Sequence, residues 1–515
     1  MDPLSDLRDA IGERAQLERP PKPDFGDYST NAAMLRAPVE GRPPREVAAT
    51  LAEELNAELG DDVDRIEVAG PGFLNLFMSE QWYRRMVATA LEQGEQFGSG
   101  EAGERVIVEF VSANPTGPVT VASARGAAIG DSLSRLLDLA GNVVEREYYI
   151  NDYGTQVRLF GESIRARARG EAPPEGGYQG DYVAELASEI DGAAEKDPDE
   201  LALDGVERMM ERVTATLERF RVHFDRFFSE RSLYEAGAAA RALDLMKERG
   251  HVYEHEGAIW LRTTTFGDDK DRVLVRSTGE NTYFASDIAY HENKLERGYD
   301  RVINVWGADH HGHIKRMAAA WQELGGEEGA FEILVMQLVN LMEGGQRARM
   351  SKRQGEFATL DELIDDIGVD AARFFLLQRS HDTKIDLDLD LAREQSNENP
   401  VYYCQYAHAR IASILRRAEV EPDASVTGEL HPSERLLIKR LLEFPEEVAI
   451  AAERRAPHRM TTYVLELAQD FSAFYRDCKV VGTPEEGFRL ALALQTKRVI
   501  ARSLDLLGVE APESM

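Results

Sequence analysis

Residues 106–150 decide the fold, and they read VIVEFVSANPTGPVTVASARGAAIGDSLSRLLDLAGNVVEREYYI. The mainly apolar run at 106–112 predicts a strand of the kind that is buried in a parallel sheet. A turn rich in Gly and Pro follows, then a helix of small residues from about 120 to 140, then a second strand at 142–150. Ligands of open α/β sheets bind at the carboxyl ends of the strands, so the turn is a candidate ligand site.

Further strands extend this unit toward the C-terminus. Two apolar runs, RVINVWG at 301–307 and FEILVMQLVNLM at 331–342, predict strands that complete the same sheet through about residue 340. Residues 151–270, between the two halves, are rich in helical patterns and include an acidic stretch, which predicts a helical insertion. We therefore expect a Rossmann-type parallel-sheet domain over residues 101–390.

Smaller domains are predicted on both sides of the sheet. Residues 1–100 combine a helical pattern at 45–59 with a strand–turn–strand pattern at 65–78, which predicts a small α+β domain. The Gly-rich run at 98–104 predicts a linker. Residues 391–515 repeat apolar side chains every three to four positions, which predicts an all-helical domain. The predicted fold class is multidomain, α/β plus all-α.

Composition limits the possible functions. The chain has 515 residues, with 60 Lys and Arg against 92 Asp and Glu, and a formal net charge of −32. Hydrophobic residues make up 43% and charged residues 30%, which excludes wholesale disorder and collagen-like structure. The acidity argues against bulk nucleic-acid binding, which usually requires a basic domain. The excess of acidic residues fits either a salt-adapted host or a GC-rich genome, and the sequence does not decide between these two explanations.

Other features bear on location and redox state. No apolar run approaches the roughly 18 residues that span a bilayer. The first residues, MDPLSDLRDA, are acidic where a signal peptide is basic, so we expect a cytoplasmic protein with no membrane partner. The two cysteines, Cys404 and Cys478, are far apart in sequence, which excludes a disulfide framework and a cysteine zinc site.

Two segments are candidates for binding anions. Residues 109–118, EFVSANPTGP, end a strand just before a helix, where free backbone N–H groups favour an anion. Residues 348–357, ARMSKRQGEF, bring three cations together on a polar segment, which suits charge that develops on transferring phosphates. Each segment also has a plainer explanation. Residues 109–118 could be only a strand–turn–helix connection, and residues 348–357 could be only a solvated charged loop.

Two further segments carry histidines and an acid–tyrosine pair. Residues 306–313, WGADHHGH, follow a predicted strand. Their imidazoles suggest a metal site, but no carboxylate or cysteine has suitable spacing, so hydrogen bonding to ribose and phosphate is the better interpretation. Tyr283 and Asp287 share a face if their segment is helical, and a buried acid beside a tyrosine suits a guanidinium. Alternatively, the pair braces a helix.

The last segment lies at the start of the helical domain. Residues 400–410, PVYYCQYAHAR, place aromatic side chains on a helix start. Aromatic rings stack on splayed RNA bases, although such a stripe is more often part of a core.

Together, these segments show that the chain closely resembles the arginyl-tRNA synthetases, a class I aminoacyl-tRNA synthetase family. The resemblance covers nearly the whole length. Besides SANPTGP before the position of the HIGH motif, the matching segments are FGDYSTNAA (25–33), the KMSKS-like RMSKR (349–353), residues 370–411 and the terminal SLDLLGVEAPESM.

The resemblance implies a ligase that joins arginine to tRNA-Arg in two steps, through an arginyl-adenylate. It implies ATP as a substrate, Mg²⁺ with the ATP, no tightly bound protein metal, and a monomer. Residues 1–100 would contact tRNA, and residues 391–515 would bind the anticodon. Members of this family activate arginine only with tRNA bound.

The resemblance also implies roles for individual residues. The arginine-binding residues would be Glu109, Ser112, Asn114, Tyr283 and Asp287. The ATP-binding residues would be Thr120, Ala122, Ser123, Gly307, Asp309, His310, Met350, Ser351 and Lys352, of which Thr120, Ser123 and Lys352 would be catalytic. The tRNA-binding residues would be Tyr402, Tyr403, Gln405, Tyr406 and Arg410.

The chain departs from the family at its first signature motif. Where the family has H-x-G-H, residues 120–123 read T-V-A-S, so both imidazoles are replaced by hydroxyls and Ala122 adds a methyl group. Losing one transition-state donor costs up to about 10²–10³ in rate. Arg349 replaces the first lysine of the second motif and keeps its charge.

The departure leaves an alternative to a working ligase. A non-catalytic paralogue that binds tRNA or arginine would tolerate the loss of both histidines. A third possibility, another class I synthetase or an adenylyl transferase, is disfavoured by the pair formed by Tyr283 and Asp287.

Overall fold

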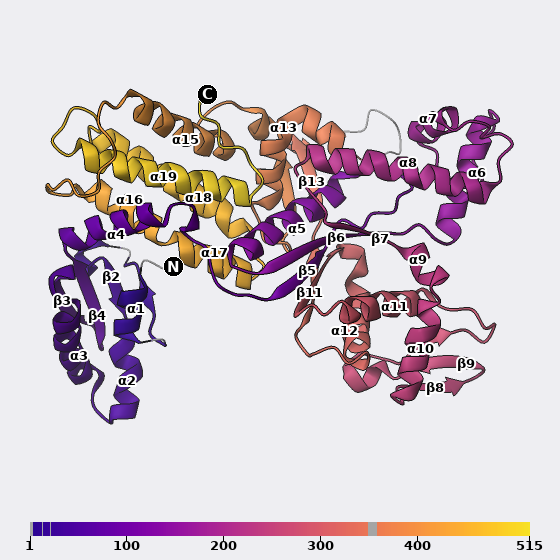
Figure 1. Cartoon of the computed structure of the whole chain (residues 1–515), viewed down its shortest axis with the longest axis horizontal. Helices are drawn as coiled ribbons and strands as arrows, with labels where there is room; N and C mark the ends of the chain where they lie inside the picture. Colours follow the sequence, from indigo (N-terminus) through magenta and orange to yellow (C-terminus); the bar gives the residue numbers. More distant parts are fainter. Residues whose placement is uncertain (1–3, 13, 21, 349–357) are drawn as a thin grey trace.

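The structure is a computed structural model that describes residues 4–12, 14–20, 22–348 and 358–515. Figure 1 shows an elongated molecule in which the N-terminal and C-terminal parts lie together at one end and the insertions at the other. The central sheet lies between them. In the described ranges, no helix is both long and apolar enough to cross a lipid bilayer.

The central sheet has five parallel strands in the order β12-β11-β5-β6-β7. The strands are β5 (Arg105–Glu109), β6 (Val143–Ile150), β7 (Arg226–Ser229), β11 (Arg301–Gly307) and β12 (Phe331–Met336). Helix α5 (Val121–Leu139) connects β5 to β6, which confirms the predicted strand–helix–strand unit and the Rossmann-type class. A Cβ at Gly130 would lie 2.2 Å from Phe110, so this glycine lets α5 approach the chain after β5 closely.

The region expected as one helical insertion is divided by a strand of the main sheet. Helices α6 (Thr155–Ala168), α7 (Asp181–Glu189) and α8 (Pro198–Arg219) lie between β6 and β7. After β7, a second unit contains a three-stranded antiparallel sheet. It comprises α9 (Glu230–Glu235), α10 (Ala238–Glu248), β8 (Val252–His255), β9 (Ala258–Leu261), β10 (Arg272–Val275) and α11 (Tyr283–Glu296).

The apolar run at 331–342 is likewise two strands rather than one. Its second half is β13 (Val339–Glu343), which pairs with β14 (Gln346–Arg347) and β15 (Ile385–Asp388) in a separate sheet. A polar break at Gln337 separates β13 from β12. The adjoining helices are α12 (Ile314–Glu323), α13 (Leu360–Leu377) and α14 (Leu389–Arg393).

The N-terminal part is the predicted small α+β unit. Its sheet has the order β1-β2-β4-β3, with strands β1 (Leu17–Glu18), β2 (Tyr28–Thr30), β3 (Val63–Ala69) and β4 (Phe73–Met78). The antiparallel pairing of β3 with β4 confirms the strand–turn–strand prediction. Its helices are α1 (Ser5–Ile11), α2 (Ala32–Glu40), α3 (Pro44–Leu59) and α4 (Glu80–Gln93).

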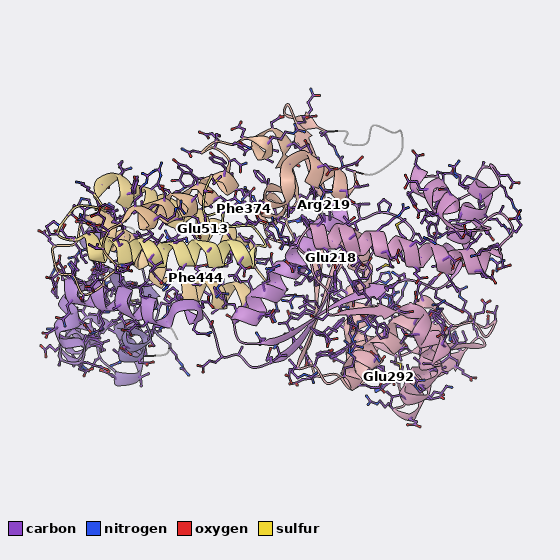
Figure 2. The ribbon with its side chains drawn as sticks, turned by 45° about the horizontal axis from the view of Figure 1, so that its top comes forward. Glu218, Arg219, Glu292, Phe374, Phe444 and Glu513 are labelled. Atoms are coloured by element: carbon purple, nitrogen blue, oxygen red, sulfur yellow. The ribbon has the colours of Figure 1, made fainter. Side chains whose placement is uncertain are left out.

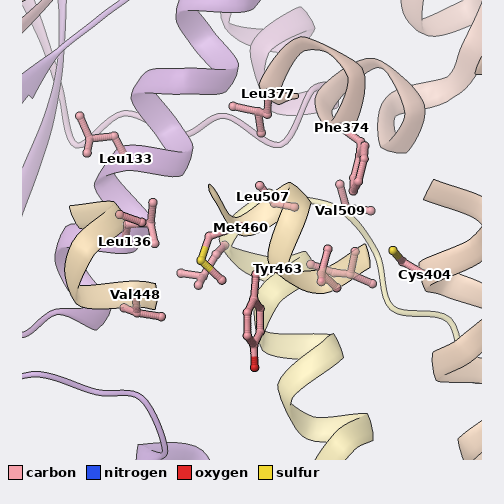
Figure 3. Packing of buried hydrophobic residues seen from close by; sticks show 14 of the residues in the cluster. Leu133, Leu136, Phe374, Leu377, Cys404, Val448, Met460, Tyr463, Leu507 and Val509 are labelled. Atoms are coloured by element: carbon pink, nitrogen blue, oxygen red, sulfur yellow. The ribbon is translucent and has the colours of Figure 1, made fainter. Parts of the chain in front are cut away.

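The C-terminal part is helical, as predicted. It consists of α15 (Pro400–Arg417), α16 (Pro432–Leu442), α17 (Phe444–Glu453), α18 (His458–Asp477) and α19 (Glu486–Leu506). Its core is continuous with that of the central domain: Figure 3 shows Leu136 of α5 near Val448 of α17. A polar contact joins the insertion to α13, since Arg219 at the end of α8, which is labelled in Figure 2, donates to Asp361 at 3.2 Å. Through the contact between α5 and α17, the helical part packs against α5, the helix that begins at the first signature turn.

Candidate active site

The candidate site lies at the carboxyl edge of the central sheet. Ser112, Asp152, Glu230 and Gly307 lie at or just beyond the ends of β5, β6, β7 and β11. Because these strands are parallel neighbours, their carboxyl ends meet at one edge. The sheet thus gathers side chains from segments that are nearly 200 residues apart.

A strained bend follows β5. Val111 and Ser112 have φ values of 66° and 39°, in the left-handed region that non-glycine residues rarely adopt. Hydrogen bonds hold the bend: the Ser112 hydroxyl donates to Glu109 Oε1 at 3.0 Å and accepts from the backbone N–H of Tyr149 at 3.2 Å. Such strain is retained where surrounding contacts over-determine the conformation, and it is common at functional sites.

Glu109 is a buried carboxylate with a buried cation. It is 5% exposed, and its Oε2 accepts from Lys294 Nζ of α11 at 2.5 Å. Burial raises the pKa of Glu109, but the Lys294 ammonium and the bond from Ser112 lower it by more, so the pKa lies below its usual range. Glu109 is therefore ionised at neutral pH.

Asp287 and Glu230 form a second acidic group. Burial, with the charge of Glu109 nearby, raises the pKa of Asp287 to about 7. Burial, with Asp287 and Asp152 nearby, raises the pKa of Glu230 to about 7. Among the described residues, none donates a hydrogen bond to the Asp287 carboxylate. Two neighbouring carboxylates that resist ionisation form a receptor for an added cation.

Two other predicted arginine-binding residues are more open to solvent. Tyr283 is the first residue of α11 and shares a face with Asp287, but its side chain is 72% exposed. Asn114 is exposed in the turn before α5. Ser112 and Glu109, in contrast, are hydrogen-bonded to each other. The predicted arginine-binding residues therefore divide into a less exposed group and a group at the surface.

The first signature turn presents two hydroxyls. Thr120 caps α5, accepts from the backbone N–H of Ser123 at 3.4 Å, and lies 3.4 Å from the Ser123 hydroxyl. Both side chains are half-buried, and Ala122 between them is exposed. The first turn of α5 also offers free backbone N–H groups, which favour an anion.

The same turn is tied to the chain that follows the second signature motif. Val121 N–H donates to the Ala358 carbonyl at 3.0 Å, and Leu360 N–H donates to the Val119 carbonyl at 2.8 Å. Thr120 and Thr359 form an antiparallel bridge between these bonds. Met350, Ser351 and Lys352 themselves lie outside the described residues, as does Arg349.

The histidine turn begins where β11 ends. Gly307 is the last residue of β11, and Asp309 and His310 belong to the short 3₁₀ helix Ala308–His313. The side chains of Asp309 and His310 lie outside the description. Within the described residues, no group of three His, Cys, Asp or Glu side chains is arranged to hold a metal ion.

A separate aromatic pocket lies on the helical domain. It has a volume of about 490 Å³ and is lined by Tyr402, Tyr403, Tyr406 and Arg410 among others. The rings of Tyr402 and Tyr406 are stacked with centroids 6.2 Å apart, and the Arg410 guanidinium lies over Tyr406 at 4.6 Å. Gln405 has a different environment, because its amide donates to Asp370 and to the Glu510 carbonyl. The pocket brings four of the five predicted tRNA contacts together.

The structure adds two residues that the sequence did not single out, Glu230 and Lys294. Glu230 begins a six-residue helix inside the segment expected to be an insertion. Lys294 lies on a helix among other charged residues. No spacing marks either residue in the sequence, because their positions depend on which strands are neighbours.

Comparisons with known proteins identify the family to which these domains belong. Three family models match: "Arginyl tRNA synthetase N terminal domain" at residues 2–78, "tRNA synthetases class I (R), catalytic domain" at residues 86–171 and 193–411, and "DALR anticodon binding domain" at residues 404–515.

Individual proteins match over nearly the whole chain. The chain is 46% identical to the arginine–tRNA ligase of Bacillus subtilis, over 99% of this chain and 97% of that protein. It is 45% identical to the arginine–tRNA ligase of Anoxybacillus flavithermus, over 97% and 94%. The solved Thermus thermophilus arginyl-tRNA synthetase matches with a TM-score of 0.81 at 25% identity, over 99% and 100%.

Proposed function

This chain belongs to the arginyl-tRNA synthetase family, and from that premise we propose which of its residues serve the reaction. The reaction is the ATP-dependent ligation of L-arginine to tRNA-Arg. A carboxylate oxygen of arginine attacks the α-phosphorus of ATP, and pyrophosphate leaves. A ribose hydroxyl at the 3′ end of tRNA then attacks the carbonyl carbon of the arginyl-adenylate, and AMP leaves.

The buried carboxylates bind arginine in this proposal. Asp287 and Glu230 receive the guanidinium, because its planar fork of N–H donors pairs with carboxylates and its positive charge offsets the burial and like charge that raise both pKa values. Glu109 stays ionised and receives the α-ammonium group, assisted by Ser112 and Asn114. The neighbouring pair of carboxylates, with Glu230 buried and Asp287 half-buried, is the observation that carries the assignment, since such a pair is costly to ionise without a cation.

The first signature turn binds ATP. Thr120 and Ser123 donate hydroxyl hydrogen bonds to the phosphates, and the backbone at the start of α5 adds N–H donors. Gly307, Asp309 and His310 follow the adjacent strand and line the adenosine. Ala122 is exposed beside the two hydroxyls, where it limits how closely the base approaches the helix.

The second signature motif supplies cations. Lys352, with Met350 and Ser351, stabilises the charge that grows on the leaving pyrophosphate. The backbone ladder between residues 119–121 and 358–360 supports this assignment, because it joins the end of this segment to the ATP turn. Mg²⁺ enters with ATP as part of the substrate.

The aromatic pocket on the helical domain binds tRNA. Tyr402, Tyr403 and Tyr406 offer stacking surfaces, and Arg410 offers a cation beside them. We assign Gln405 an indirect part, because its amide is bonded to the C-terminal segment. We further propose a monomer, the state that the family resemblance implies, and a cytoplasmic enzyme, because its substrate is a tRNA.

The test is transfer of labelled arginine to tRNA-Arg by the wild type and by Asp287→Asn. We expect the wild type to charge tRNA, and we expect kcat/KM for arginine to fall about 10²–10³-fold in Asp287→Asn, because a buried charge partner is lost.

The matched control is Glu292→Gln, which removes a carboxylate from the same helix (Figure 2). The charged neighbours of Glu292 are Glu296, Arg241 and Arg249 rather than the site, so we expect kcat/KM within about twofold of the wild type. Equal losses in both variants would contradict the assignment of Asp287.

A further inference from the structure

Lys294 is a buried lysine at the back of the arginine site. It is fully buried, and its ammonium donates to Glu109 Oε2 at 2.5 Å and to Asn304 Oδ1 at 2.9 Å. It also lies 4.3 Å from the ring centroid of Tyr290, one turn earlier on α11. Glu109 and Asn304 face each other in the register between β5 and β11. Lys294 therefore joins α11 to two adjacent strands at the edge where the site lies.

A chain of hydrogen bonds continues from Lys294 to the other end of the site. Asn304 accepts from Lys294 through Oδ1, so its Nδ2 is the atom that donates to His291 Nε2, at 3.3 Å. His291 then carries its proton on Nδ1 and donates to the Asp287 carbonyl at 2.7 Å. Burial lowers the pKa of His291 to about 4, which agrees with a neutral ring having this one tautomer.

These hydrogen bonds fix the distance between the two ends of the proposed arginine site. Glu109 belongs to β5, and Asp287 belongs to α11. The distance between their carboxylates is therefore set by how closely α11 docks on the sheet. Each hydrogen bond from Lys294 has a defined donor and acceptor, so the docking has one preferred geometry.

Resting on the proposed function, we infer that Lys294 is a positioning residue that sets the span between Glu109 and Asp287 and thereby selects an amino acid with the length of arginine. It touches neither ATP nor arginine in this proposal. Its effect passes through Glu109 directly and through Asn304 and His291 to the backbone of Asp287.

The experiment measures equilibrium binding of arginine, homoarginine and norarginine to the full chain. The two analogues keep the guanidinium and the amino acid ends but differ from arginine by one methylene, longer or shorter. We expect the wild type to prefer arginine by at least about tenfold, the lower end of what one methylene is worth in a fitted pocket. In Lys294→Met this preference falls to within about threefold, and Lys294→Arg restores part of it.

A matched control separates selectivity from stability. Lys439 is another buried lysine in an ion pair, with Nζ 3.1 Å from Asp27, and it lies away from the arginine site. We expect Lys439→Met to lower the melting temperature and to leave the ratio of arginine to homoarginine binding unchanged. If Lys294→Met binds all three amino acids with the wild-type ratios, Lys294 has a structural role alone and the inference is overturned.

A second variant covers failure to fold. Glu109→Gln/Lys294→Met replaces both buried charges by neutral groups of similar size. We expect it to fold, to bind all three amino acids more weakly because the proposed partner of the α-ammonium group loses its charge, and to show the relaxed length preference. Retention of the wild-type ratio in this variant also overturns the inference. Because binding is measured without charging, a wild type that binds arginine but transfers none would count against the proposed function and leave this result valid. A wild type that binds none of the three overturns both.

Discussion

The two ends of the proposed active site bind groups of opposite charge, and they do so with different kinds of side chain. We propose that the arginine end binds a cation through the carboxylates of Glu109, Glu230 and Asp287. Glu109 and Glu230 are buried, Asp287 is half-buried, and Glu109 is hydrogen-bonded to Lys294 of α11. The ATP end holds anions with the hydroxyls of Thr120 and Ser123, which are half-buried on a helix start. Buried charge leaves little freedom for substitution, because any unpaired group is costly. An open helix N-terminus tolerates the exchange of one hydrogen-bond donor for another, because the backbone N–H groups stay in place.

The largest effect of a single substitution is expected from removing a carboxylate at the arginine end. Glu230→Gln removes one of the two proposed partners of the guanidinium, so we expect kcat/KM for arginine to fall about 100-fold. The KM for ATP stays within about twofold. Steady-state aminoacylation with each substrate varied checks both values. A normal KM for arginine would remove Glu230 from the site.

The pH dependence of arginine binding tests the same end without a mutation. Because burial raises the pKa values of Asp287 and Glu230 to about 7, each carboxylate is mostly protonated at pH 6 and mostly ionised at pH 8. The cationic substrate favours the ionised form, so we expect arginine affinity to rise about tenfold or more from pH 6 to pH 8. Calorimetric titration at several pH values measures this. In Asp287→Asn the rise is smaller, and a flat profile in the wild type would contradict the raised pKa values.

A smaller effect is expected from restoring the family motif at the ATP end. In Thr120→His/Ala122→Gly/Ser123→His, imidazoles replace the hydroxyls, but α5 loses its capping side chain, worth about 1 kcal/mol. We expect kcat to change by less than about tenfold and the KM for arginine to stay unchanged. A rise in kcat of about 100-fold or more would mean that the two hydroxyls stabilise the transition state much less than imidazoles do.

The smallest effect concerns a buried carboxylate away from the site. Glu323 ends α12, is fully buried, and neither of its side-chain oxygens has a partner in the described part of the chain. Burial raises its pKa from 4.5 to about 8. The folded protein therefore loses stability through this group as pH rises from about 4.5 toward 8, because ionisation then favours the unfolded chain.

Glu323→Gln removes that penalty without touching either end of the site. We expect its melting temperature to exceed that of the wild type by a margin that grows between pH 5 and pH 8, with unchanged aminoacylation. Thermal unfolding at a series of pH values checks this. Glu327→Gln, which alters an exposed carboxylate nearby, should show no such growth.

The fold was largely predictable because its signals are local. Apolar runs such as residues 106–109 and the small-residue helix after them follow directly from periodicity. Two predictions about strand pairing were wrong. Strand β7 lies within the expected insertion but pairs with β6 in the main sheet, and β13 pairs with β15 in a separate sheet. Neither strand differs in composition from its neighbours, so only the assembled sheet decides where each belongs.

The candidate site was predictable to a similar degree. Glu109, Asp287 and Thr120 stand in motifs that the family resemblance identifies. Glu230 and Lys294 belong to no such motif, and their relevance comes from β7 pairing with β6 and from α11 covering the sheet. The family resemblance implies Gln405 as a tRNA contact, but the resemblance does not show that the Gln405 amide donates to the Glu510 carbonyl of the C-terminal segment.

The role of the two hydroxyls is tested most directly by arginine transfer to tRNA-Arg by the wild type and by Thr120→Ala/Ser123→Ala. We expect the wild type to charge tRNA and the double variant to lose about 100-fold or more in kcat, with the KM for arginine within about threefold. Thermal unfolding accompanies the assay, because Thr120 also caps α5. A wild type that binds tRNA-Arg without charging it, or a folded double variant that charges tRNA as fast as the wild type, would contradict the proposed catalytic role of the hydroxyls.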